Sequence, residues 1–167
     1  HYFGVEDPIS LKDIKWTHGQ YDTEELTRVY TAEGTLAKQR AQAIGAALER
    51  YTADLRDVKG LGFCVSKKHA HFMADYFNQM GIASQALDAD SPHDLRRAVR
   101  QQLERGEIHF IFTVDLFNEG VDIPSINTVL FLRPTQSMTV FLQQLGRGLR
   151  LSEGKDCLTV LDFVAQA

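Results

Sequence analysis

Residues 61–80 read LGFCVSKKHAHFMADYFNQM, a short apolar run followed by a longer amphipathic one. The apolar run at 61–65 has the length of a strand that is buried on both faces. Ser66 follows it, and serine is a preferred N-cap residue because its side-chain oxygen accepts a hydrogen bond from a free N–H group of the first helical turn. The sequence therefore predicts a strand and then a helix over residues 67–80.

The same order of strand and helix repeats on both sides of this stretch. Upstream, apolar residues at helical intervals, Leu36 among them, predict an amphipathic helix from Gly34 to about Leu55, with Arg40 among the polar residues between them. Downstream, the pattern predicts strands at 82–87, 108–114, 128–132 and 158–161, and helices after Pro92 and at 138–145. Such alternation favours an α/β fold with a largely parallel central sheet covered by helices, and functional loops at the carboxyl ends of the strands.

Length and composition indicate one globular domain, with residues 34–167 as the folded unit. Residues 1–33 break the alternation and are interpreted as a connecting segment or N-terminal extension. The chain starts with His1 instead of methionine, so we expect it to be part of a longer protein. No apolar run reaches the roughly 18 residues of a membrane span and no signal peptide is recognisable, which predicts a cytoplasmic protein without a membrane partner.

The net charge, the cysteines and the histidines argue against a broad basic surface and against a metal site. A net charge of -4 argues against a broad basic surface, so any contact with nucleic acid must be local. Cys64 and Cys157 lie in apolar runs and are expected to be buried thiols. His69 and His71 point in different directions on a helix, and no metal site is predicted.

Two further segments place polar residues directly after apolar strands. Residues 113–124 read TVDLFNEGVDIP, and residues 143–150 read QQLGRGLR. In the second segment Arg147 and Arg150 stand three positions apart among glycines, so both guanidinium groups can reach one phosphate. The alternative is a pair of solvated cations at a helix end, where the helix dipole favours positive charge.

These segments together resemble motifs of the superfamily-two helicases. Residues 113–124 are similar to the fifth motif of that family, and residues 143–150 match the sixth, glutamine-x-x-glycine-arginine-x-x-arginine. Residues 63–66, FCVS, resemble the fourth motif, and the resemblance covers residues 34–167. The stretches YFG at 2–4 and WTHGQYD at 16–22 are similar to a bacterial subgroup of multidomain, DEAD/DEAH-type or restriction-subunit-like helicases.

The resemblance implies the C-terminal RecA-like lobe, a three-layer α/β sandwich, of an ATP-dependent helicase or translocase. In this family ATP lies between two lobes, so Arg147 and Arg150 would act as arginine fingers in catalysis. Gln143 would lie near the same phosphates, and Gly120 and Asp122 near the ribose and the cleft between the lobes. A buried aspartate that caps a loop is the alternative for Asp122.

The resemblance also implies that Ser66 and Thr113 bind the nucleic-acid backbone, because a hydroxyl group at a strand end can bind phosphate without reading the base. A simple helix N-cap is the alternative for Ser66, and a solvated helix face is favoured for Lys67 and Lys68. The implied partners are DNA or RNA and the N-terminal RecA-like lobe.

The chain has neither a phosphate-binding loop of the type G-x-x-x-x-G-K-[ST] nor an Asp-Glu box for Mg²⁺. We therefore expect ATP and Mg²⁺ to be held mainly by the first lobe of the full-length protein, and no cofactor or ATP hydrolysis in this part alone. Two other functions remain open. One is a noncatalytic scaffold that binds protein or nucleic acid. The other is a dinucleotide-dependent enzyme, which the absence of a G-x-G-x-x-G turn disfavours.

Overall fold

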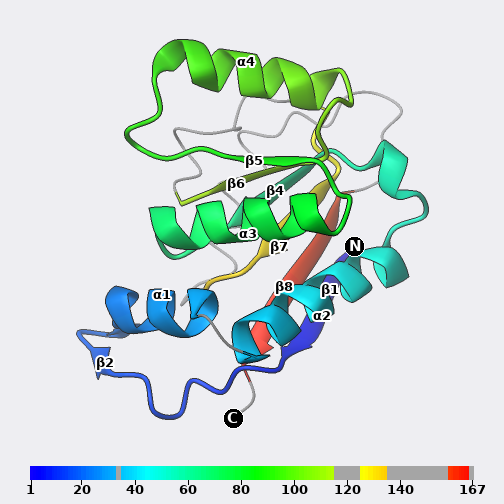
Figure 1. The fold of residues 1–167 in the computed structure, drawn as a ribbon. Helices are drawn as coiled ribbons and strands as arrows, with labels where there is room; N and C mark the ends of the chain where they lie inside the picture. Colours follow the sequence, from blue (N-terminus) through cyan, green and yellow to red (C-terminus); the bar gives the residue numbers. More distant parts are fainter. Residues whose placement is uncertain (33–34, 115–124, 135–157, 166–167) are drawn as a thin grey trace.

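The computed structural model describes residues 1–32, 35–114, 125–134 and 158–165. Within these ranges, six parallel strands form one sheet in the order β1-β8-β7-β4-β6-β5 (Figure 1). The strands are β1 (Tyr2–Asp7), β4 (Gly60–Phe63), β5 (Ser84–Ala86), β6 (Phe110–Thr113), β7 (Thr128–Phe131) and β8 (Thr159–Ala165). Because they are parallel, all their carboxyl ends meet at one edge of the sheet.

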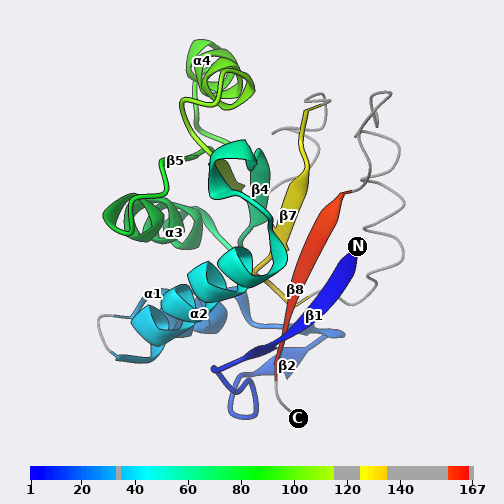
Figure 2. The same ribbon diagram turned by 90° about the vertical axis from the view of Figure 1, so that its right-hand side faces the viewer.

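Helices cover both faces of this sheet. They are α1 (Thr23–Thr31), α2 (Thr35–Tyr51), α3 (Lys67–Gln79) and α4 (His93–Glu104). Figure 2 shows α1, α2 and α3 on one side of the sheet, where α2 and α3 contribute to one apolar cluster with its strands. The apolar residues of α4 join a second cluster, on the opposite face. The predicted three-layer arrangement with a parallel sheet is confirmed.

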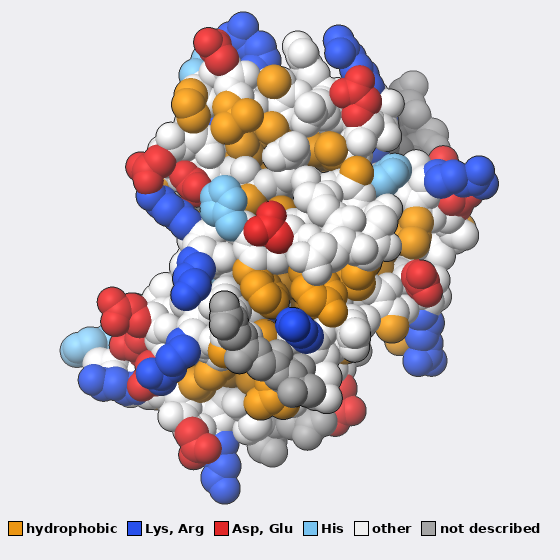
Figure 3. Space-filling view, in the orientation of Figure 1, with side chains coloured by type: hydrophobic (Ala, Val, Ile, Leu, Met, Phe, Trp, Pro, Cys, Tyr) orange, Lys and Arg blue, Asp and Glu red, His pale blue; other side chains and the backbone are white. Residues whose placement is uncertain are grey.

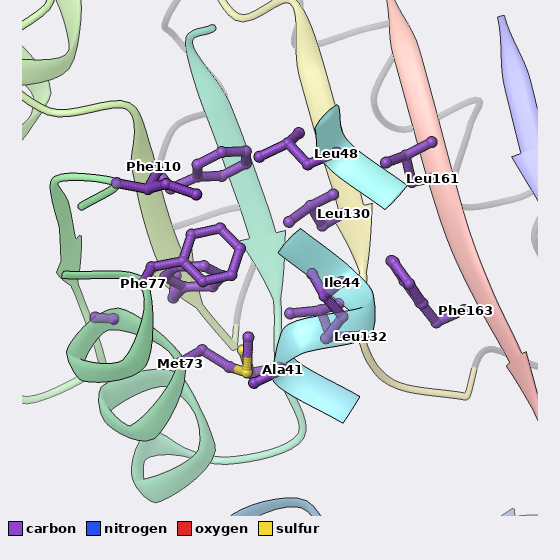
Figure 4. Packing of buried hydrophobic residues seen from close by; sticks show 14 of the residues in the cluster. Ala41, Ile44, Leu48, Met73, Phe77, Phe110, Leu130, Leu132, Leu161 and Phe163 are labelled. Carbon is purple, nitrogen blue, oxygen red and sulfur yellow. The ribbon is translucent and has the colours of Figure 1, made fainter. Parts of the chain in front are cut away.

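Aromatic rings fill the first of these two interfaces. The ring of Phe77 on α3 packs edge-on against Phe110 of β6, with ring centroids 5.4 Å apart (Figure 4). It packs in the same way against Phe112 of β6, with ring centroids 5.0 Å apart. The rings of Phe110 and Phe112 lie over the backbone of β4 where it carries Gly60 and Gly62. These glycines therefore provide the space that lets α3 approach the centre of the sheet.

The N-terminal residues contribute more structure than their sequence pattern indicated. Strand β1 pairs with β8 and forms the edge of the main sheet. The short strands β2 (Trp16–Thr17) and β3 (Gln20–Tyr21) form a hairpin, and α1 follows after the N-cap residue Asp22, whose side chain accepts a hydrogen bond from Glu25 N. Asp22 is therefore a local sequence signal for the start of this helix.

Two positions of α2 differ from the amphipathic pattern. Leu36, counted on the apolar face, is 59% exposed in the first turn of the helix. Arg40, counted with the polar residues, is only 2% exposed. A helical wheel alone cannot separate a solvated arginine from one that is buried beside a carboxylate.

None of the helices in the described ranges has the length and apolar composition of a membrane span.

Candidate functional site

Ser66 and Thr113 lie at the carboxyl edge of two neighbouring strands. Phe63, the last residue of β4, is in register with Thr113 at the end of β6. The N–H group of Cys64 continues the pairing and donates to the carbonyl oxygen of Thr113 at 2.8 Å. The structure therefore brings these two predicted contact residues to the same part of the sheet edge.

Ser66 is half-buried, and its hydroxyl oxygen has two protein contacts. Its oxygen accepts a hydrogen bond from the N–H group of His69 at 3.3 Å, which confirms the predicted N-cap of α3. The hydroxyl oxygen of Thr27, on α1, lies 2.6 Å from the same oxygen. Ser66 thus joins the end of β4, the start of α3 and the middle of α1, while part of its surface remains open to solvent.

Thr113 has a different environment. Its side chain is fully buried, and its hydroxyl oxygen has no hydrogen-bond partner. A buried polar group without a partner destabilises the folded state by about 1–3 kcal/mol. In this arrangement a phosphate group cannot touch the Thr113 hydroxyl group directly.

A buried ion pair lies at the same end of the molecule. The guanidinium group of Arg40 donates through Nε to Asp7 Oδ2 at 2.8 Å and through Nη2 to the carbonyl oxygen of Leu132 at 2.8 Å. Its Cζ atom lies 3.9 Å from the ring centroid of Tyr30. Arg40 therefore holds together the end of β1, the end of β7 and helix α1. Burial raises the pKa of Tyr30 to about 12.

The imidazole ring of His69 is fully buried beside this pair. It stacks on Tyr30 with ring centroids 5.0 Å apart, and its Nδ1 accepts a hydrogen bond from the N–H group of Val65 at 3.1 Å. Burial, with smaller contributions from Arg40 and Arg133, holds the pKa of His69 well below its usual value. The ring is therefore neutral, carries its proton on Nε2, and braces the loop between β4 and α3.

Neighbouring polar groups contact several of the ionisable side chains around the loop. Lys67 pairs with Asp90, and His71 Nε2 lies 3.0 Å from Asp88 Oδ2. Asp88 Oδ1 also accepts from the N–H group of Asp90, a local hydrogen bond that is common for aspartate in turns. Figure 3 shows acidic and basic side chains interspersed over this face, in keeping with the low net charge.

The remaining predicted site residues lie outside the described ranges. They are Gly120, Asp122, Gln143, Arg147 and Arg150. Within the described ranges, no group of three or more His, Cys, Asp or Glu side chains is arranged to hold a metal ion. Cys64 is buried as expected, whereas Cys157 also lies outside the described ranges.

The sequence reasoning missed four residues beside this loop: Thr27 contacts Ser66, Tyr30 stacks on His69, and Arg40 lies between Tyr30 and Asp7. Asp7 and Thr27 fall in the segment that was interpreted as a connection. A helix that starts after the Asp22 cap places Leu26 and Tyr30 one and two turns along the same face. This cap was the available sequence signal for the position of Tyr30.

Comparisons with known proteins identify the family. The family model described as helicase conserved C-terminal domain matches residues 41–152. The putative ATP-dependent helicase IRC3 of Saccharomyces cerevisiae is 33% identical over 102 residues, and UvrABC system protein B of Nitratidesulfovibrio vulgaris is 33% identical over 108 residues. These matches cover 61% and 60% of this chain and 15% of each relative, so the chain spans a small part of both.

A likeness to a solved structure supports the same fold. The crystal structure of the Escherichia coli DEAD-box protein SrmB superposes with a TM-score of 0.62 at 16% identity, covering 98% of this chain and 75% of that one. The family model covers about two thirds of the chain, including the segments at 113–124 and 143–150. The chain therefore belongs to the helicase conserved C-terminal domain family and is the C-terminal RecA-like lobe of a superfamily-two helicase.

Proposed function

We propose that this lobe completes the ATP site of an ATP-dependent helicase or translocase and carries part of its track for nucleic acid. The observation that carries the proposal is the pattern QQLGRGLR at 143–150, which lies inside the family match. The name of the relative IRC3, a putative ATP-dependent helicase, supports the same activity. Stepwise closing of the two lobes on ATP would drive movement along the polymer.

Arg147 and Arg150 are the proposed arginine fingers. Phosphoryl transfer builds negative charge on the γ-phosphate oxygens, and two guanidinium groups with the Gln143 amide form a donor set that suits these oxygens. Gly120 and Asp122 would border the ribose. The described residues offer no carboxylate cluster for Mg²⁺, so the proposal assigns Mg²⁺ and most contacts with ATP to the N-terminal lobe.

Ser66 and Thr113 are the proposed contacts with the backbone of DNA or RNA. Their adjacent positions at the carboxyl edge of β4 and β6 support a shared role. Ser66 is the accessible member of the pair, whereas Thr113 would require its surroundings to open. Both side chains would contact the phosphate backbone through a hydroxyl group, so binding would be independent of base sequence.

Steady-state turnover in the full-length protein tests the fingers. We expect Arg150→Ala and Arg147→Lys to reduce nucleic-acid-stimulated ATP hydrolysis on the order of 10³-fold, with a much smaller change in ATP affinity. Arg105→Ala is the matched control, because Arg105 is exposed at the end of α4, next to the amino edge of the sheet. Normal turnover in both finger variants would refute the assignment.

The isolated chain should not hydrolyse ATP, because the fingers need a nucleotide held by the other lobe. If the wild-type full-length protein shows no turnover with single- or double-stranded DNA or RNA, the noncatalytic scaffold becomes the better explanation. ATP hydrolysis by the isolated chain would contradict the split site.

A further inference from the structure

The hydroxyl group of Thr27 has one proton and two acceptors within reach. Its oxygen lies 2.8 Å from the carbonyl oxygen of Thr23, in the preceding turn of α1, and 2.6 Å from Ser66 Oγ. A hydroxyl group donates a single hydrogen bond and accepts others. The direction of the bond between Thr27 and Ser66 therefore determines where the Ser66 proton points.

Two arrangements follow from this geometry. If Thr27 donates to the Thr23 carbonyl, the Ser66 proton turns inward to the Thr27 oxygen. If Thr27 donates to Ser66, the Ser66 oxygen accepts from both Thr27 and the His69 N–H group. The Ser66 proton then remains for an acceptor on the exposed side of the residue.

A phosphate diester of a nucleic-acid backbone selects the second arrangement. It is an acceptor only, so Ser66 must donate to it. A hydroxyl oxygen that accepts two hydrogen bonds is polarised and becomes a stronger donor, an effect that increases in partly buried surroundings. The charge on the phosphate strengthens the outgoing bond further.

We infer that Thr27 is a positioning residue that orients the Ser66 hydroxyl group toward a backbone phosphate of the bound nucleic acid. The inference rests on the proposed contact between Ser66 and nucleic acid. Helix α1, which precedes the matched family region, would then contribute to the nucleic-acid site through Thr27. The stack of Tyr30 on His69 fixes α1 and the β4–α3 loop relative to each other, so the two hydroxyl groups stay in register.

The test measures binding of the full-length protein to labelled single-stranded DNA and to the matching RNA by fluorescence anisotropy at several salt concentrations. The variants are Thr27→Val, Thr27→Ser, Ser66→Ala and Thr27→Val/Ser66→Ala. We expect Thr27→Val to weaken binding of the preferred polymer about threefold, the loss of one ordinary hydrogen bond. Thr27→Ser should restore it. In the Ser66→Ala background, Thr27→Val should add nothing, because the two residues act as a unit.

Thr31→Val is the matched control. Thr31 lies one turn further along α1 and its hydroxyl group donates to the Thr27 carbonyl oxygen at 2.6 Å, the same type of bond to a preceding turn. It should leave polymer affinity unchanged. Thermal unfolding of each variant shows whether it folds, and the KM for ATP should be the same in all of them.

Each result separates the inference from the proposed function. If Ser66→Ala weakens binding but Thr27→Val does not, the inference is overturned and the role of Ser66 stands. Equal losses from Thr27→Val with Ser66 present and absent would mean a purely structural effect, and would also overturn the inference. If Ser66→Ala alone leaves binding unchanged, the proposed contact itself fails.

Discussion

Three buried polar atoms at the carboxyl edge of the sheet have no hydrogen-bond partner in the described structure. They are Arg40 Nη1, His69 Nε2 and Thr113 Oγ1. Each such group destabilises a folded protein by about 1–3 kcal/mol, and most proteins tolerate few of them. Proteins accept such costs mainly at functional sites. The three unpartnered atoms therefore support a functional role for this edge, as proposed for Ser66.

The neutral state of His69 predicts a pH dependence of stability. Its pKa in the folded protein is well below 6.5, so below pH 6.5 the unfolded chain binds a proton that the folded chain excludes. The free energy of unfolding should therefore fall as the pH drops, by at most about 1.4 kcal/mol per pH unit from this residue. Urea denaturation at a series of pH values should show a shallower fall for His69→Asn, which keeps an acceptor for the Val65 N–H group.

His71→Asn is the control for this comparison, because His71 is exposed on the same helix. It should leave the steep dependence in place. Equal slopes for the wild type and His69→Asn would contradict the buried neutral imidazole. The overall stability of His69→Asn is expected to drop as well, since its stack on Tyr30 is lost, so only the slope is diagnostic.

At the scale of elements, the packing of Phe110 and Phe112 against the central strand β4 depends on the absence of side chains at Gly60 and Gly62. A Cβ atom at Gly62 would lie 2.4 Å from the nearest ring carbon of Phe112, and one at Gly60 would lie 2.2 Å from Phe110. Both rings are confined between the sheet and Phe77 of α3. Gly45 on α2 differs, because a Cβ atom there would meet only the flexible end of Met80 at 3.3 Å.

The same substitution at these two glycines should therefore have different effects on the free energy of unfolding. Gly62→Ala should lower the free energy of unfolding by about 1–3 kcal/mol, the usual cost of overpacking. Gly45→Ala should be neutral or raise it by up to about 1 kcal/mol, because alanine stabilises a helix interior and the Met80 tip can shift. Chemical denaturation of both variants beside the wild type measures the difference. A loss from Gly45→Ala as large as that from Gly62→Ala would show that backbone context, and not ring packing, decides.

The sequence predicted those elements that bury a continuous apolar run or a complete helical face. Strands β4, β6 and β7 and helix α3 are of this kind, and Ser66 was readable as a cap because its signal is local. The edge strand β1 and the two-residue strands β2 and β3 carry no comparable period. Arg40 was misread because its burial depends on Asp7, 33 residues away, and such a pairing leaves no local pattern.

At the scale of the whole molecule, many contacts join residues 1–32 to the rest of the described chain, and three of them bear on the carboxyl edge of the sheet or its edge strand. Strand β1 pairs along β8, Asp7 binds Arg40, and Thr27 contacts Ser66. Two of these contacts converge on loops that follow β4 and β7, since Arg40 also binds the Leu132 carbonyl oxygen. A displacement of the N-terminal segment would therefore be transmitted to the carboxyl edge of the sheet, where Ser66 lies.

The Asp7–Arg40 pair provides the final test of this integration. Asp7→Asn keeps the acceptor for the Ile9 N–H group but leaves the guanidinium charge buried without a counter-ion, so we expect a loss of about 3–5 kcal/mol in the free energy of unfolding. Adding Arg40→Met removes the uncompensated charge and should recover much of that loss. Asp54→Ala, which breaks an exposed pair with Arg56, should change stability little in the same urea titration. If Asp7→Asn is as mild as Asp54→Ala, or if Arg40→Met gives no recovery, the N-terminal segment is not held by this pair, and β1 must be held in the sheet by its pairing with β8 and by the packing of Phe3 and Val5 against the core.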